Sequence, residues 1–164
     1  PTRRSSDLPS VLDHELRLYC SRYVPVDETL IPTGELKDVS GTAMDFTARK
    51  RIGRDMERVP GGYDHCFVVE PSAEALAPVA ELFAPASGRR MDVFSTMPGV
   101  QFYTGNFLDG TSRGPGGAAY NRHAGMCLET EYYPDSINQP AFPSIVLQPG
   151  EEYRHRTLHR FSAE

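Results

Sequence analysis

Residues 98–134 read PGVQFYTGNFLDGTSRGPGGAAYNRHAGMCLETEYYP, and the rest of the chain is arranged around this stretch. Its first thirteen residues combine three glycines with three aromatic rings, amides and a carboxylate. Near its other end, Glu129 stands between Leu128 and Thr130. Glycine permits tight turns and aromatic residues favour strands, so the pattern indicates strands joined by turns. The density of polar and ring side chains indicates a binding site.

Glu129 follows the apolar run Met126–Leu128, so we expect it where a strand passes from the core towards its polar end. Such a carboxylate would be only partly solvated. Partial burial makes a carboxylate a better base near neutral pH. The alternative is an ordinary surface carboxylate at the end of a strand.

The neighbouring side chains suit a sugar. The rings of Phe102 and Tyr103 offer flat apolar surface to the C–H face of a sugar ring. Gln101, Asn106 and Asp109 offer the donors and acceptors that hydroxyl groups need.

Composition sets the limits on fold and partners. The 164 residues suit one domain with a substantial core, and a net charge of −5 gives no reason to expect nucleic acid. No apolar run approaches the length of a membrane helix. The three cysteines, Cys20, Cys66 and Cys127, are far apart and odd in number, which favours reduced thiols in the cytoplasm over disulfides or a zinc site.

Fourteen prolines and fourteen glycines divide the chain into short elements, so the predicted fold class is all-β, an antiparallel β-sandwich. Apolar alternation or short apolar runs predict strands at Leu16–Cys20, Phe67–Val69, Val79–Phe83 and Met91–Thr96. Residues 72–78 are expected to form a turn, since Pro78 would break a helix. The segment from Tyr23 to Phe46 is rich in turn formers and predicts a loop.

Asp64 lies in the run GGYDHCFVVE, where two glycines precede a short apolar strand. It therefore projects from the entrance of that strand. From the pattern alone, it either caps the turn or contacts a ligand.

Near the C-terminus, Ile145–Leu147 and Tyr153–Phe161 predict two strands joined as a hairpin at Pro149-Gly150. His155 and His159 would then share one face. A metal site there is disfavoured, because no third ligand lies nearby in sequence.

Two further groups of residues leave alternatives open. His123 either orients Glu129 or is an ordinary loop residue. The basic residues between Arg49 and Arg58 form a solvated loop or helical turn or, less favoured, an anion site.

The first eight residues, PTRRSSDL, show no periodicity and resemble the translation of a common sequencing adapter. We expect residues 1–8 to be a non-native addition and residues 9–164 to be the protein proper.

Several motifs resemble the C-terminal half of the aldose 1-epimerase family. They are RYVPVDETLIPTGE at 22–35, GTAMDF at 41–46, GYDHCF at 62–67, SGRRMDVFSTMPGVQFYTGNFLDG at 87–110 and HAGMCLETEYYPDSINQPAFPS at 123–144. The resemblance extends from about Val11 to Phe161.

This resemblance implies part of the large antiparallel sandwich called a galactose mutarotase-like supersandwich. It also implies an enzyme that interconverts the α and β anomers of free aldohexoses, such as galactose and glucose, without a cofactor. The expected partner is the sugar, with the protein a monomer or a homodimer. Glu129, in LET, matches the family's general base. Asp64, in GYDH, and Gln101, in PGVQ, match positions that hydrogen-bond sugar hydroxyls.

The chain departs from the family pattern because the motif with the general acid histidine is absent. His14, in a DHE context, does not match it. We therefore expect this polypeptide alone to be nearly inactive and poorly soluble. Two alternatives remain: a non-catalytic carbohydrate-binding module of the same fold, and a relative acting on phosphorylated hexoses through the basic run.

Overall fold

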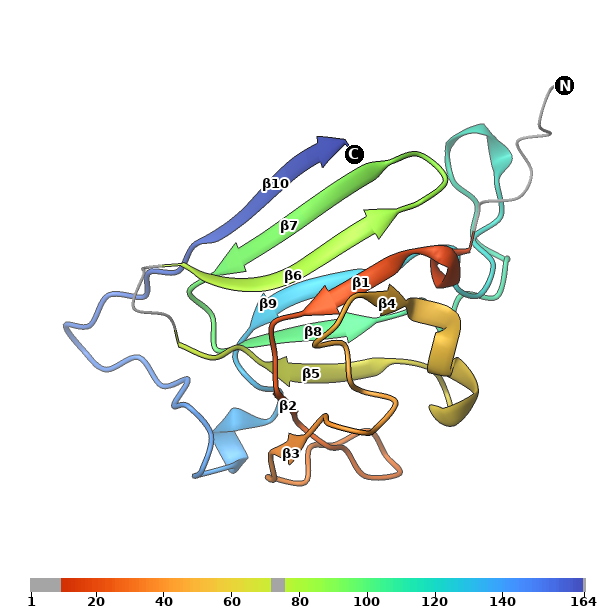
Figure 1. The fold of residues 1–164 in the computed structure, drawn as a ribbon. Helices are drawn as coiled ribbons and strands as arrows, with labels where there is room; N and C mark the ends of the chain where they lie inside the picture. Colours follow the sequence, from red (N-terminus) through yellow and green to blue (C-terminus); the bar gives the residue numbers. More distant parts are fainter. Residues whose placement is uncertain (1–9, 72–75, 164) are drawn as a thin grey trace, which may run out of the picture.

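The computed structural model describes residues 10–71 and 76–163. The expected non-native stretch at 1–8 lies outside the described residues, as do residues 72–75 of the predicted turn. The described part forms two five-stranded sheets whose pairings are all antiparallel (Figure 1).

The first sheet has the order β10-β7-β6-β1-β4. Its strands, in that order, are Thr157–Ala163, Arg89–Ser95, Ala77–Ala84, Glu15–Leu18 and Lys50–Arg51. The second sheet has the order β3-β2-β5-β8-β9. Its strands are Lys37–Asp38, Arg22–Tyr23, Asp64–Val68, Gly99–Tyr103 and Cys127–Glu131.

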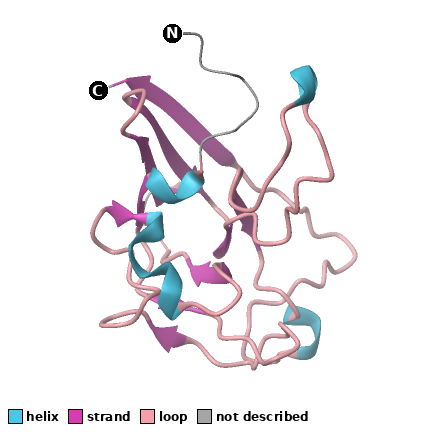
Figure 2. Ribbon diagram, turned by 90° about the vertical axis from the view of Figure 1, so that its right-hand side faces the viewer, coloured by secondary structure: helices cyan, strands magenta, loops and turns pink. Residues whose placement is uncertain are grey.

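The helical segments of the described part are short 3-10 turns, and long loops join many of the strands (Figure 2). The turns are η1 (Val11–Asp13), η2 (Ile52–Arg58), η3 (Pro115–Gly117) and η4 (Ser136–Asn138). None of them has the length and hydropathy needed to cross a membrane.

The main core lies between the two sheets. Leu16 and Leu18 alternate with more exposed residues along β1, as a strand with one buried face requires. Phe67 and Phe102 meet them from β5 and β8, and both are fully buried. Burying a side chain of this size stabilises the fold by about 1.5–3 kcal/mol. Because the inner face of each sheet packs against this core, the alternate side chains of its strands lie on the outer face.

The predicted strands of residues 16–96 are confirmed, with boundaries moved by a few residues. Asp64 is the first residue of β5, so it does stand at a strand entrance. The predicted turn is wrong at Ala77 and Pro78, which lie inside β6; the pairing register with β7 shifts there, between Pro78 and Ala80. A proline cannot donate to a ladder, and a local irregularity accommodates it.

The predicted C-terminal hairpin is wrong. Residues 145–147 belong to no strand, and β10 begins at Thr157 and pairs with β7 along all seven of its residues. The turn itself is present, since the Glu151 N–H donates to the Gln148 carbonyl at 3.0 Å. The turn forms from local hydrogen bonds. The partner of β10 is set instead by β7, which pairs with it along seven residues.

The three cysteines are free, and Cys20 and Cys66 are buried. Burial, with a smaller contribution from Glu70, raises the pKa of Cys20 to about 12. Burial raises the pKa of Cys66 as well. These two thiols therefore remain protonated at neutral pH and act as small core residues.

Candidate active site

Three adjacent strands bring the predicted site residues to one face of the second sheet. Gln101 on β8 pairs with Cys66 on β5 and with Glu129 on β9. Asp64 lies two residues before Cys66 on β5, and residues two apart in a strand share a face. Asp64, Gln101 and Glu129 therefore lie together on the outer face, away from the core formed by Phe67 and the inner face.

Gln101 and Asp64 are joined directly. The Gln101 side-chain nitrogen donates to Asp64 Oδ1 at 2.7 Å. The other end of the amide, Gln101 Oε1, is buried and has no hydrogen-bond partner within the described part of the chain. A buried acceptor without a partner is costly, so this oxygen suits a donor brought by a ligand.

A pocket of about 220 Å³ lies at this pair. Its polar lining includes Asp64 and Gln101. Its remaining lining residues are Val24, Val26, Leu30, Pro32, Cys66 and Pro134. The volume is below the roughly 300–1,000 Å³ of pockets for drug-sized ligands, so it suits a small molecule.

Glu129 does not have the expected environment, because its side chain is exposed. The prediction of partial burial is wrong for a physical reason. Among the described residues, β9 pairs only with β8 and forms the edge of its sheet, and the outer face is left open at this point. Glu129 is therefore accessible to a ligand without being desolvated by the described part of the chain.

Glu131 adds a second carboxylate to the same face of β9. It is half-buried and lies two residues after Glu129. Burial, followed by the charge of Glu129, raises the pKa of Glu131 to about 6. Burial, followed by the charges of Glu129 and Asp64, raises the pKa of Cys127. The sequence patterns did not single out Glu131, although its two-residue spacing from Glu129 could have done so.

The two rings expected to form a sugar platform point to opposite faces. Phe102 is fully buried in the core, so its predicted role is wrong. Tyr103 pairs with Asp64 across the strands and lies on the outer face. Its hydroxyl accepts the Phe107 backbone N–H at 3.0 Å, and the two rings stack with centroids 6.1 Å apart.

Two other predicted hydroxyl partners have structural roles. Asn106 is buried, donates to the Tyr63 carbonyl at 2.9 Å and accepts from the Thr104 hydroxyl at 2.7 Å. Asp109 is exposed and caps a turn at Thr111. Neither lines the pocket at Asp64 and Gln101.

His123, His155 and His159 do not line the pocket at Asp64 and Gln101. His123 Nδ1 is 2.7 Å from the Thr104 carbonyl, which favours its interpretation as a loop residue. His155 precedes β10, while His159 lies within it. Nowhere among residues 10–71 and 76–163 do three histidine, cysteine or acidic side chains gather as a metal site would require.

The basic run faces acidic partners at the first sheet and η2. Lys50 Nζ lies 2.7 Å from Asp55 Oδ2, and Arg49 lies 3.3 Å from Glu15 and 3.4 Å from Glu81. The helical-turn prediction is confirmed by η2. None of these cations lines the pocket at Asp64 and Gln101, so the phosphorylated-hexose alternative gains no support there.

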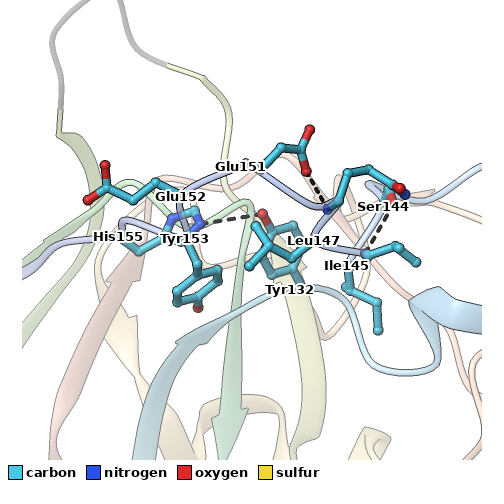
Figure 3. Close-up of a pocket in the computed structure, with 10 residues that line it drawn as sticks. Tyr132, Ser144, Ile145, Leu147, Glu151, Glu152, Tyr153 and His155 are labelled. Carbon is cyan, nitrogen blue, oxygen red and sulfur yellow. Dashed lines mark hydrogen bonds between the residues drawn. The ribbon is translucent and has the colours of Figure 1, made fainter.

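A larger hollow of about 610 Å³ lies on another part of the surface (Figure 3). There the Tyr132 hydroxyl is 3.3 Å from His155 Nε2, with Tyr153 beside them. Asp64, Gln101 and Glu129 do not line it. Asp64 and Gln101 line the smaller pocket instead, whereas Glu129 lines neither of the two.

The wall formed by residues 24–32 was missed by sequence reasoning. The loop predicted from Tyr23 to Phe46 is right over 24–32 but wrong at Tyr23, which ends β2, and at Lys37–Asp38, which form β3. The packing of 24–32 across the outer face of β5 was not foreseen. Pro25 and Pro32 bracket it in the sequence, and that is the one local signal of a rigid excursion.

Comparisons with known proteins reveal close similarity. A family model described as Aldose 1-epimerase matches residues 3–160. Galactose mutarotase of Homo sapiens is 49% identical over 155 residues, covering 94% of this chain and 45% of the human protein. Aldose 1-epimerase of Escherichia coli K12 is 39% identical over 162 residues, covering 94% of this chain and 46% of that protein.

Solved structures agree with the fold. The GalM/aldose epimerase homologue from C. elegans superposes with a TM-score of 0.85 at 25% identity, covering 94% of this chain and 47% of its own. Galactose 1-epimerase from Lactobacillus acidophilus superposes with a TM-score of 0.68 at 25% identity, covering 94% of this chain and 45% of its own. The chain thus spans about half the length of the relatives that it matches.

Proposed function

Because the chain belongs to the aldose 1-epimerase family, we propose that it supplies the base and two sugar-binding residues of an enzyme that interconverts the α and β anomers of free aldohexoses. Glu129 is the proposed base, and Asp64 and Gln101 are the proposed sugar-binding residues. The observation that carries the proposal is the register of β5, β8 and β9, which sets Glu129 beside the hydrogen-bonded pair of Gln101 and Asp64.

The chemistry needs a base and an acid. The base removes the proton from the anomeric hydroxyl while an acid protonates the ring oxygen, and the ring opens. Rotation of the C1 carbonyl and reclosure give either anomer. An accessible carboxylate such as Glu129 can accept the proton. Asp64 can accept a sugar hydroxyl, and the unpaired Gln101 Oε1 can accept a second.

The acid is proposed to come from polypeptide outside this sequence, since the family's acid motif does not occur in it. We therefore propose that the 164-residue chain is one part of the active enzyme and turns over slowly by itself. The three proposed site residues come from one chain, which is compatible with either a monomer or a homodimer. The free, buried thiols support a cytoplasmic location.

Binding to the chain itself is the first test. Titration of ¹⁵N-labelled protein with D-galactose or D-glucose should shift the side-chain amide signals of Gln101. A sugar that leaves these signals unchanged at high millimolar concentration would contradict the proposed site.

Turnover is the second test, and it uses a chimera that joins this chain to the part of human galactose mutarotase that it does not match. Polarimetry of fresh α-D-galactose should show catalysis by the chimera. Glu129→Gln should lower the rate by about 10²–10⁴ with little change in sugar affinity. Glu152→Gln, an exposed loop carboxylate, is the matched control and should retain the rate.

The second candidate function is a non-catalytic carbohydrate-binding module. The same two measurements distinguish it from the enzyme. It is favoured by the direct Asp64–Gln101 bond, which a binder would also use. A binder would show Gln101 shifts in the chain and no catalysis in the chimera, with or without Glu129.

A further inference from the structure

The turn that walls the pocket is fixed by one carboxylate. Asp27 Oδ1 accepts the backbone N–H groups of Thr29 at 2.8 Å and Ile31 at 3.1 Å, and also the Thr29 hydroxyl at 2.6 Å. The backbone of Asp27 exchanges further bonds with Ile31 and Leu30, at 2.9 and 3.1 Å. A bridge between Val26 and Pro32 closes the loop. The turn is therefore held in one conformation.

Leu30 is held in a strained backbone conformation at the tip of this turn. Its φ is +65°, in the left-handed region that costs a leucine about 1–2 kcal/mol and that glycine or asparagine adopts readily. Its side chain is 55% exposed, so burial in the core does not explain the choice of leucine. Strain of this kind clusters at functional sites.

Leu30 lines the same pocket as Asp64 and Gln101. We propose that Leu30 is a specificity-determining residue, which offers an apolar contact to the C–H edge of the sugar bound by Asp64 and Gln101 and disfavours sugars with a charged substituent. This inference rests on the proposed function of the pocket.

The other residues that line the pocket are also mostly apolar. Four other wall residues are apolar: Val24, Val26, Pro32 and Pro134. No lysine, arginine or histidine is among the described residues that line the pocket. An anionic substituent would meet the Asp64 carboxylate or an apolar wall, with no cation to offset the loss of hydration. The pocket therefore suits a neutral sugar.

The test compares D-galactose with D-galacturonate, which carries a carboxylate, through the Gln101 side-chain amide signals of the 164-residue chain. Wild type should bind galactose more tightly than galacturonate. Leu30→Gly and Leu30→Asn fit the backbone conformation but lack the apolar branch, so each should weaken galactose binding by about threefold or more while the melting temperature is unchanged or higher. Leu30→Lys should shift the preference towards galacturonate.

Ile31 provides the matched control. It is 52% exposed, belongs to the same turn and does not line the pocket. Ile31→Gly and Ile31→Lys should leave the galactose-to-galacturonate preference as in wild type.

The experiment distinguishes a failure of the proposed function from a failure of the role assigned to Leu30. If no sugar shifts the Gln101 amide, the proposed function fails and this inference fails with it. If galactose shifts the amide but the Leu30 variants behave like the Ile31 variants, the pocket binds sugar and the assignment to Leu30 is overturned. Wild type that binds galacturonate as tightly as galactose overturns it too.

Discussion

Gln101 donates its side-chain N–H to Asp64 Oδ1 at 2.7 Å, and this bond joins β8 to β5 on the outer face of the sheet. The donor is an amide and the acceptor is a carboxylate, so the bond is charge-assisted and stronger than a neutral one. It also determines the orientation of the amide and leaves Gln101 Oε1 as the buried acceptor. The hydrogen bond between Gln101 and Asp64 therefore stabilises the sheet, and the two residues also belong to the candidate site.

Gln101→Glu should destabilise the fold in a pH-dependent way. The substitution replaces the donor with a second carboxylate against Asp64, and like charges at this separation repel. We expect a loss of about 1–3 kcal/mol near pH 7.5 and a smaller loss in a buffer at about pH 4, because protonating one carboxylate of the pair removes the repulsion. Thermal melts at the two pH values measure it. The control Gln148→Glu adds the same charge to an exposed loop. An equal loss at both pH values would indicate lost packing instead of repulsion.

Glu131→Gln should stabilise the protein at neutral pH. Burial and the charge of Glu129 raise the pKa of Glu131 from 4.5 to about 6 in the folded protein. A raised pKa means that the folded state prefers the protonated form, so the contribution of Glu131 is fully present below pH 4.5 and lost as the pH rises through 6. The neutral glutamine avoids this loss.

The difference in melting temperature between Glu131→Gln and wild type should therefore grow from pH 4.5 to above pH 6 and then level off. Glu152→Gln, which removes an exposed charge, gives the background for general charge effects. A difference that stayed flat over this range would show that Glu131 titrates normally.

Gly62→Ala should be much more destabilising than Gly61→Ala. Both glycines have positive φ, +90° and +83°, and alanine there is strained by about 1–2 kcal/mol. At Gly62 the added Cβ would also lie 2.1 Å from Asn106 Oδ1, which is fixed by its own hydrogen bonds, while at Gly61 nothing lies within 4 Å. Urea unfolding should give a larger loss for Gly62→Ala by about 1–3 kcal/mol. Equal losses would show that the Asn106 side chain can move away.

Asp92→Asn should loosen β10. Burial pushes the pKa of Asp92 up, but hydrogen bonds from Arg160 and Arg90 outweigh it and hold the pKa below its usual range. The carboxylate therefore stabilises the fold at neutral pH, and this contribution is lost as the pH falls through its folded pKa. Removing the charge of this buried residue should cost about 2–4 kcal/mol near neutral pH and speed amide exchange in 157–163.

The control for Asp92→Asn is Asp13→Asn. Asp13 also contacts an arginine, Arg51, but its side chain is 72% exposed, so the expected cost is below about 1 kcal/mol. Similar costs for the two variants would show that burial adds nothing to the Asp92 network.

The sequence predicted the longer strands β1, β5, β6 and β7 well because their signals are local, whereas the two-residue strands β2, β3 and β4 were missed. Leu16 and Leu18 alternate with polar neighbours, and β1 buries one face accordingly. The all-β class follows from the same short elements. The grouping of Asp64, Gln101 and Glu129 could not be obtained from local patterns, because it depends on which strands become neighbours. Only the resemblance of their motifs to a family suggested it.

The errors have a common cause in long-range packing. Glu129 follows an apolar run, but its exposure depends on whether anything covers the edge strand β9. Phe102 and Tyr103 are adjacent in sequence and point to opposite faces, so only Tyr103 lies on the outer face that carries Asp64 and Gln101. Leu30 lies more than thirty residues from Asp64, and nothing local indicated that they would line one pocket.

The pairing of Gln101 with Glu129 has a consequence for how the protein can vary. Alternate residues of β8 face opposite sides, so a one-residue insertion ahead of Gln101 within the strand would turn its amide into the core and an apolar side chain outward. Insertions and deletions should therefore be tolerated in the connection at 107–122 and rejected inside β5, β8 and β9. New specificities in this lineage would then arise by exchanging side chains and loop lengths around a strand scaffold whose length stays constant.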